Sequence, residues 1–307
     1  MKHLTKVSDL NVEQATHLVE SAFAYKHKFD LGIRKENVLG GKMVAMVFEK
    51  PSLRTKVAFE IATEYLGGTA VYLSQSQILA SGNNVKGRES VPDIARNLER
   101  FSDLILARVY EHSTIADIVE HVAKPVINAL CDQHHPTQAL ADIMTMQWHK
   151  GPDTKLKVVF IGDGNNVAVS LMEICVLFGH EFVFCGPGGY QIPADLVQGV
   201  KGPGSVTVMN DPESAVVDAD CVYTDTFVSM GQEEEQTKRL QAFAGYQVDV
   251  KLFKAAKPDA IFMHCLPAHR GEEVTDEVMD HERSVVFDQA ECRMHVAKAL
   301  LAGFLSQ

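Results

Sequence analysis

The chain lacks most of the features that mark specialised classes of protein. Its 307 residues include six cysteines, which form no CxxC pair and whose spacing fits neither a zinc site nor a compact disulfide framework. Its 29 basic residues are outnumbered by 40 acidic ones, giving a formal net charge of −11, and this balance argues against a nucleic-acid partner. No stretch approaches the roughly 18 to 20 apolar residues of a membrane span, and the first residues contain no apolar core of signal length. These absences predict a cytoplasmic protein with reduced thiols and no membrane partner.

The composition that remains is that of an ordinary globular protein. Hydrophobic residues make up 46% of the chain and charged residues 22%, which is enough apolar surface for a buried core. A length of 307 residues suits about two domains. The sequence shows no internal repeat and no low-complexity tract.

Short apolar runs alternate with segments of helical periodicity along most of the chain. The predicted strands are Met43–Phe48, Ala70–Leu73, Leu104–Ala107, Val126–Ile127, Leu156–Ile161, Phe182–Phe184, Cys221–Tyr223 and Ala260–Met263. The predicted helices are 12–29, Arg54–Leu66, Val91–Phe101, Ile115–Val122, Pro136–His149, Val167–Phe178 and Glu291–Phe304. This alternation predicts an α/β fold built of βαβ units around parallel sheets.

A connector interrupts the alternation at Lys150-Gly151-Pro152-Asp153. We therefore predict two similar domains, residues 1–149 and 150–290, each a parallel sheet flanked by helices. The last helix, within 291–307, is expected to pack back on the first domain. Ligands of parallel sheets bind where the carboxyl ends of the strands meet their connections, and the motifs below all lie at such positions.

The segment Ser52-Leu53-Arg54-Thr55 lies where a predicted strand gives way to a helix. A helix start offers unpaired N–H groups and the positive end of the helix dipole. Two hydroxyls and a guanidinium add donors that match phosphate oxygens. The segment indicates a phosphate site, although Ser and Thr also serve as ordinary helix caps.

Further polar residues follow other predicted strands. Arg108 comes directly after Leu104–Ala107, and His135-Pro136-Thr137-Gln138 opens a helix. Gly162-Asp163-Gly164-Asn165-Asn166 resembles the opening of a dinucleotide fingerprint. Val167 replaces the third glycine of that fingerprint, which argues against NAD. Taken alone, each of these motifs also fits a capped helix or a surface loop.

Two motifs in the second half combine carboxylate, hydroxyl, thiol and imidazole groups. Asp225 is followed by Ser229-Met230-Gly231, and its carboxylate suits an ammonium ligand. His264-Cys265-Leu266-Pro267 follows an apolar strand, where a thiol beside an imidazole can take part in chemistry. Arg293 lies early in the last predicted helix.

Together, in this order, these motifs resemble the aspartate/ornithine carbamoyltransferase family over nearly the whole chain. The segment from Phe48 to Thr55 is similar to the family's phosphate loop, and His135-Pro136-Thr137-Gln138 to its HPTQ motif. Three more segments resemble the ornithine branch of the family; they begin at Asp163, Asp225 and His264.

The resemblance implies a two-domain enzyme whose active site lies in the cleft between the domains, and it implies roles for particular residues. The catalytic residues implied are Arg54, Arg108, His135, Cys265 and Arg293. Those implied to bind carbamoyl phosphate are Ser52, Leu53, Arg54, Thr55, Gln77, Arg108, His135, Gln138, Cys265, Leu266 and Arg293. Those implied to bind ornithine are Asn166, Asp225, Ser229 and Met230.

The implied reaction joins carbamoyl phosphate to the side-chain amine of L-ornithine and yields L-citrulline and phosphate. The resemblance implies no metal and no cofactor, and it implies a homotrimer or a multiple of trimers, with Gln77 supplied by a neighbouring subunit. The chain departs from the family's pattern at Leu53, Lys56 and Cys292 and in the Gly- and Asn-rich segment 79–88. Four alternatives stay open: a carbamoyltransferase for putrescine, one for an acylated ornithine, a non-catalytic carbamoyl-phosphate-binding homologue, and a dinucleotide oxidoreductase.

Overall fold

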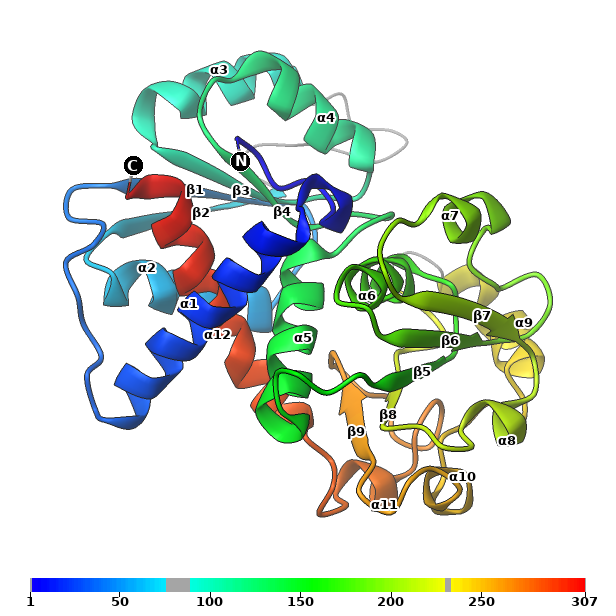
Figure 1. The fold of residues 1–307 in the computed structure, drawn as a ribbon. Coiled ribbons are helices and arrows are strands. Elements are labelled where there is room, and N and C mark those ends of the chain that lie inside the picture. The colour runs from blue at the N-terminus through cyan, green and yellow to red at the C-terminus, as the bar shows by residue number, and fades with distance from the viewer. Residues whose placement is uncertain (1, 76–88, 230–232, 307) are drawn as a thin grey trace. The chain divides into compact units, whose positions relative to one another are not determined.

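The computed structural model describes residues 2–75, 89–229 and 233–306 and divides into two compact units (Figure 1). The first unit comprises Met1–Ala141 and Glu291–Gln307, and the second comprises Asp142–Ala290. The structural division falls within helix α5 (Pro136–Lys150), whereas the domain border predicted from the sequence lies between residues 149 and 150. That predicted border stays a prediction.

The first unit is built on a four-stranded parallel sheet with the order β2-β1-β3-β4. Its strands are β1 (Met43–Phe48), β2 (Thr69–Ser74), β3 (Leu104–Arg108) and β4 (Val126–Leu130). Every residue of β3 and β4 is buried, as expected for strands covered by helices on both faces. Each of these strands begins within one residue of the start that its apolar run predicted.

Helices cover both faces of this sheet, with α3 and α4 on one side and α1 and α2 on the other (Figure 1). The helical elements are η1 (Val7–Asp9), α1 (Val12–Asp30), α2 (Arg54–Tyr65), α3 (Val91–Phe101), α4 (His112–His121) and the later part of α12 (Val286–Leu305). Local sequence sets the helix starts. Asn11 and Gln14 form a capping box at α1, and Ser90 caps α3, which has a proline in its first turn.

The second unit contains a five-stranded parallel sheet with the order β7-β6-β5-β8-β9. Its strands are β5 (Lys157–Ile161), β6 (Glu181–Cys185), β7 (Ser205–Met209), β8 (Cys221–Thr224) and β9 (Ile261–His264). Strand β7 was not predicted from the sequence. It lies at the edge of the sheet and none of its residues is buried, so it lacks the continuous apolar run by which the central strands were found.

Alternate residues of the central strands build two cores in the second unit. Phe160 stacks on Phe184 and Tyr223 on one face, while Val159 and Phe262 belong to the apolar cluster on the other. The helical elements are α6 (Asn166–Leu177), α7 (Ala194–Gly199), α8 (Pro212–Ala215), η3 (Glu233–Glu235), α9 (Gln236–Ala242), α10 (Val250–Lys254) and α11 (Asp276–Met279). In the part of the chain that the structure describes, no helix combines the length and the apolar character needed to cross a membrane.

Candidate functional site

In the first unit the predicted phosphate loop lies at the start of α2, directly after β1. The helix begins at Arg54, and its N-cap residue, Leu53, provides no side-chain acceptor. The Ser52 Oγ accepts a hydrogen bond from the Thr55 N–H at 3.2 Å. Since the first turn of α2 contains no acidic residue, the positive end of the helix dipole is available for an anion.

Arg108, His135 and Arg293 lie close together in the same unit, although they come from distant parts of the chain. Arg108 is the last residue of β3, His135 immediately precedes α5, and Arg293 belongs to α12. All three are at most 8% exposed. Burial, followed by the charges of Arg293 and Arg108, holds the pKa of His135 well below its usual range. His135 is therefore a neutral imidazole at physiological pH.

Arg293 also connects this cluster to the phosphate loop. Its Nη2 donates a hydrogen bond to the Thr55 Oγ1 at 2.5 Å. Gln138, which is 1% exposed, lies in the first turn of α5, where its N–H donates to the His135 carbonyl at 3.1 Å. The structure thus brings the sequence-predicted residues Thr55, His135, Gln138 and Arg293 into one polar cluster.

Lys50 is a buried cation that the sequence analysis did not select. It is 8% exposed, and its ammonium lies 4.9 Å from the centre of the Tyr110 ring. Burial and the nearby charge of Arg108 lower the pKa of Lys50. In the sequence, only the position of Lys50 between a buried strand and Ser52 could have indicated a role in the site. Lys50 and Arg108 carry like charges and are both buried. Binding of an anionic ligand nearby would reduce the repulsion between them.

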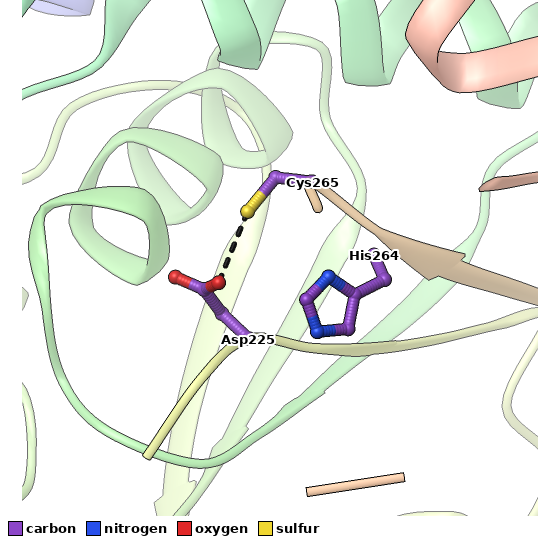
Figure 2. Close-up of side chains that lie close together, drawn as sticks. All are labelled: Asp225, His264 and Cys265. Atoms are coloured by element: carbon purple, nitrogen blue, oxygen red, sulfur yellow. Dashed lines mark hydrogen bonds between the residues drawn. The ribbon is translucent and has the colours of Figure 1, made fainter. Parts of the chain in front are cut away.

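In the second unit the candidate groups lie where three neighbouring strands end. Asp163 follows β5, Asp225 follows β8 and Cys265 follows β9, and these strands are adjacent in the sheet. The Cys265 thiol donates to the Asp225 Oδ1 at 3.1 Å (Figure 2). Asp225 is 6% exposed. A buried carboxylate at the carboxyl ends of these strands is suited to bind a cationic group of a ligand.

The two Asn residues after β5 lie at the start of α6. The Asn165 Oδ1 caps α6 by accepting from the N–H groups of Val167 and Ala168, and its Nδ2 donates to the Asp225 Oδ2 at 2.9 Å. Asn166, the predicted ornithine ligand, is the first residue of α6. Its role in binding stays a prediction.

Gly164 explains why this loop resembles a dinucleotide fingerprint. A Cβ at residue 164 would lie 2.4 Å from the backbone nitrogen of Ile192, so close packing of the chain itself requires glycine there.

Arg239, on α9, is a second residue that the sequence analysis missed. Its Nε donates to the Phe227 carbonyl at 2.7 Å, and its Nη2 lies 2.5 Å from the Asp163 Oδ2. Arg239 is 4% exposed. Burial raises the pKa of Asp163 to about 6, and the neighbouring guanidinium limits that rise. Arg239 thereby fastens the segment after β8 to the loop after β5.

The remaining predicted residues are placed as follows. Leu266 has a backbone φ of 58°, a left-handed conformation that is uncommon for a residue with a branched side chain. Ser229 is half-buried in the segment after β8. Gln77 and Met230 lie outside the described residues, as does the segment 79–88.

Two groups of side chains have the residue types of metal ligands within the described residues. In the first, ligand atoms of Asp225, His264 and Cys265 lie within 4.8 Å of one another. Both ring nitrogens of His264 already have hydrogen-bond partners. Its Nδ1 accepts from the Leu266 N–H at 2.9 Å, and its Nε2 contacts the Glu273 Oε1 at 3.1 Å. The second group is His269, Glu272 and Glu273, and it shares that same Glu273. Neither arrangement needs an ion to account for its geometry.

Comparison with known families identifies two domains in the sequence. Residues 2–148 match the carbamoyl-phosphate-binding domain of aspartate/ornithine carbamoyltransferases, and residues 154–304 match the Asp/Orn-binding domain. The chain belongs to this family. The family resemblance predicted from the motifs is therefore confirmed, and so is the α/β fold with two parallel sheets.

Individual relatives extend the match over the whole chain. An anabolic ornithine carbamoyltransferase of Pyrococcus furiosus is 44% identical over 98% of this chain and 95% of its own length. The ornithine carbamoyltransferase of Bacillus subtilis is 43% identical over 99% and 94%. The solved structure of the Pyrococcus furiosus enzyme has a TM-score of 0.93 at 44% identity and covers 99% of this chain and 97% of its own. The Thermus thermophilus enzyme has a TM-score of 0.89 at 41% identity, covering 99% of each chain.

Proposed function

We propose that this protein is an enzyme that transfers the carbamoyl group of carbamoyl phosphate to the side-chain amine of L-ornithine, giving L-citrulline and phosphate. The observation that carries the proposal is the buried cluster of Arg108, His135 and Arg293 beside a helix start with phosphate-binding character. Membership of the family and the relatives named ornithine carbamoyltransferase support the same activity.

In this proposal the first unit binds the carbamoyl donor. Ser52, Arg54 and Thr55, together with the backbone N–H of Leu53, bind the phosphate oxygens at the start of α2. Arg108 bridges phosphate and carbonyl, and Gln138 binds the carbamoyl amide. His135 and Arg293 donate to the carbonyl oxygen, on which negative charge develops as the amine attacks. Stabilising that oxyanion is commonly the largest catalytic contribution, and one donor is worth about 2.7 to 4 kcal/mol.

The second unit binds the amino acid. We assign the Asp225 carboxylate to the α-ammonium group of ornithine, with Asn166, Ser229 and Met230 as its neighbours in binding. Cys265 and Leu266 are proposed to contact the substrates from the turn after β9. The attacking amine has a solution pKa of about 10.4 and must lose its proton, which a desolvated site near cationic side chains favours.

The decisive experiment incubates the purified protein with carbamoyl phosphate and L-ornithine and measures citrulline. Putrescine and an acylated ornithine are offered in parallel reactions. Turnover of ornithine above both is expected. Acylation removes the charge of the α-ammonium that Asp225 is proposed to bind, and putrescine lacks the α-carboxylate that the Asn166 amide suits. Tight binding of carbamoyl phosphate by calorimetry without any turnover would instead identify a non-catalytic homologue.

The family resemblance also supports a trimer, or a multiple of trimers, in the cytoplasm. In this arrangement Gln77 reaches carbamoyl phosphate from a neighbouring subunit. Sedimentation equilibrium tests the assembly directly, since a mass of one subunit at micromolar concentration contradicts it.

A further inference from the structure

A buried carboxylate, Glu273, lies behind the turn that carries Cys265 and Leu266. Glu273 has no role in the proposed mechanism and is not among the site residues predicted from the sequence. Glu273 is 0% exposed, as is His264. Its Oε1 is 3.1 Å from the His264 Nε2 and accepts the backbone N–H of His269 at 2.5 Å. One carboxylate oxygen thus binds both ends of the segment 264–269.

The hydrogen bonds around His264 indicate which ring nitrogen accepts and which donates. The Leu266 N–H donates to the His264 Nδ1 at 2.9 Å, so Nδ1 is the acceptor and Nε2 the donor. That Nε2–H donates to Glu273. His264 therefore links Glu273 to Leu266, which is the residue held in the left-handed backbone region at φ 58°. A strained conformation of this kind persists only when the surrounding contacts fix it.

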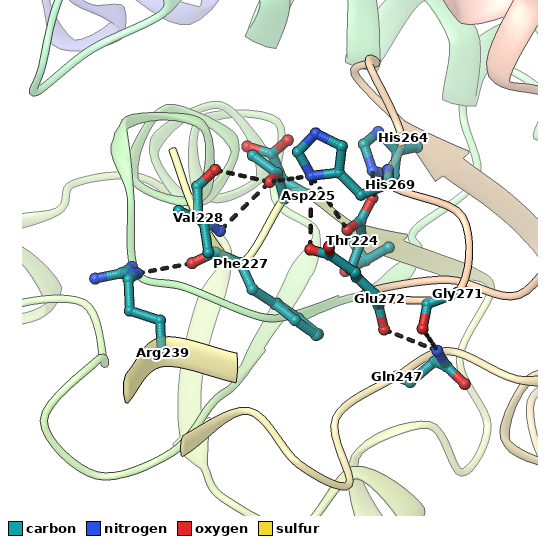
Figure 3. Close-up of polar contacts among 12 residues, drawn as sticks. Thr224, Asp225, Phe227, Val228, Arg239, Gln247, His264, His269, Gly271 and Glu272 are labelled. Carbon is teal, nitrogen blue, oxygen red and sulfur yellow. Dashed lines mark hydrogen bonds and ion pairs between the residues drawn. The ribbon is translucent and has the colours of Figure 1, made fainter. Parts of the chain in front are cut away.

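His269 extends the same network to the segment after β8. Its Nδ1 lies 3.0 Å from the Thr226 Oγ1, and this hydroxyl in turn donates to the Val228 carbonyl at 2.9 Å. The contact joins the segment that carries Asp225 to the one that carries His264 and His269 (Figure 3). The second oxygen of Glu273, Oε2, has no hydrogen-bond partner among the described residues and lies 4.0 Å from the same His269 Nδ1.

Glu273 is itself held rigidly by its neighbours in the chain. Its carbonyl accepts the N–H of Val248 at 2.9 Å. The Gln247 Nε2 donates to the carbonyls of Gly271 and Glu272 at 2.6 and 2.9 Å. These bonds hold the backbone at Glu273 in place, so its side chain can position the turn after β9.

We propose that Glu273 is a positioning residue, which sets the conformation of the turn Cys265–Pro267 through His264 and His269 and keeps that turn attached to the segment that carries Asp225. The inference deepens the proposed function, on which its kinetic part rests. The role depends on the place of one acceptor oxygen and not on the negative charge. Two substitutions separate these possibilities, because glutamine keeps the length without the charge and aspartate keeps the charge without the length.

The test compares Glu273→Gln with Glu273→Asp, and uses Glu277→Gln and Glu277→Asp as matched controls at an exposed glutamate of α11. The first measurement is the rate at which iodoacetamide alkylates Cys265, followed by peptide mass spectrometry. This thiol is half-buried while the other five cysteines are buried. The second is amide hydrogen exchange in the peptide containing Leu266 and His269. Neither measurement requires turnover.

We expect Glu273→Gln to stay within about threefold of the parent in alkylation, exchange and kcat/KM for ornithine, because its oxygen can accept both N–H groups. Glu273→Asp should raise the alkylation rate of Cys265 at least tenfold and lower kcat/KM at least tenfold, with the larger part of the loss in KM for ornithine. The Glu277 controls should resemble the parent.

An aspartate variant that is less affected than the glutamine variant would overturn the proposal in favour of a role for the charge. Alkylation and exchange rates that stay at parental values in both variants would overturn it as well. A parent protein that forms no citrulline refutes the proposed function, and the alkylation and exchange measurements then still decide the role of Glu273.

Discussion

At the scale of single residues, the candidate site depends on cations held where water is scarce. Arg108 and Arg293 are 6% and 8% exposed, and their charges contribute to keeping His135 neutral. Burying like charges close together is costly unless hydrogen bonds or an opposite charge compensate them. The first unit thus has the electrostatic character of a site for a phosphorylated ligand, and single substitutions there should affect binding more than folding.

Replacing Arg54 by alanine should weaken the binding of carbamoyl phosphate and leave the fold intact. Arg54 is half-buried at the start of α2, and a hydrogen bond to a charged group contributes about 1.5 to 3 kcal/mol. The dissociation constant from calorimetry should therefore rise by about 10- to 150-fold. Arg54→Lys is the control, since it keeps the charge and loses the planar fork. Turnover of Arg54→Ala within a few-fold of the parent would contradict the assignment of this residue.

Replacing His135 tests the role of a neutral imidazole. His135→Ala should lower kcat by about 10²- to 10³-fold, the range for removing one donor to an oxyanion, while His135→Gln keeps an N–H donor and should lose less. Because burial and the charges of Arg293 and Arg108 hold the pKa of His135 well below its usual range, the protonation of this residue should not set the acidic limb of the rate profile. The acidic limb of the rate profile should therefore have the same midpoint in the parent and in His135→Gln. A midpoint that moves on this substitution would show that His135 itself titrates there.

At the scale of elements, the ends of parallel strands and the starts of helices supply nearly every candidate group. Asp163, Asp225 and Cys265 follow strands β5, β8 and β9, which are neighbours in one sheet. Arg239 adds a connection between two of these strand ends, because it contacts both Asp163 and the Phe227 carbonyl. Side-chain contacts therefore connect the loops at the carboxyl ends of these strands, in addition to the backbone hydrogen bonds between the strands themselves.

Breaking the Asp163–Arg239 pair should destabilise the second unit. Arg239→Met leaves a buried carboxylate without its guanidinium and should lower the free energy of unfolding by about 3 to 5 kcal/mol. Combining it with Asp163→Asn should recover part of that loss, since the two groups are in contact. Lys251→Met is the matched control, because the Lys251–Glu213 pair is exposed. Urea unfolding of the parent, Arg239→Met, Asp163→Asn and the double variant measures the coupling, and strictly additive losses would contradict a specific pair.

Sequence patterns predicted the elements that are buried and the motifs at their ends. Strand β1 and helix α3 have the bounds predicted for them, because an uninterrupted apolar run and a Ser-capped segment are local signals. The edge strand β7 was missed, since its partial exposure leaves no apolar run. Arg239 and Glu273 were missed for another reason: their partners lie 76 residues and up to nine residues away, and a contact of this kind leaves no periodic signal in the sequence.

At the scale of the whole molecule, buried neutral histidines occur in both units. His134 belongs to the first unit and His180 to the second; they are 8% and 4% exposed. Burial lowers the pKa of each to about 4, with smaller contributions from nearby charges such as His112 and Lys155. The unfolded chain binds a proton at such a residue below pH 6.5, whereas the folded chain does so only near pH 4. The free energy of unfolding should therefore decrease as the pH falls through this interval.

His180→Asn isolates one of these contributions. The His180 Nδ1 accepts the Leu156 N–H at 3.3 Å, and the asparagine oxygen can take over this bond without binding a proton. Between pH 7 and 4.5 the unfolding free energy of the parent should fall by on the order of 2 kcal/mol more than that of the variant. Over this interval the unfolded parent binds a proton at His180, whereas the folded parent largely does not. Urea titrations at several pH values measure the difference, in which the contributions of all other titrating groups cancel. Parallel curves for the two proteins would mean that the folded chain protonates His180 as readily as the unfolded chain does.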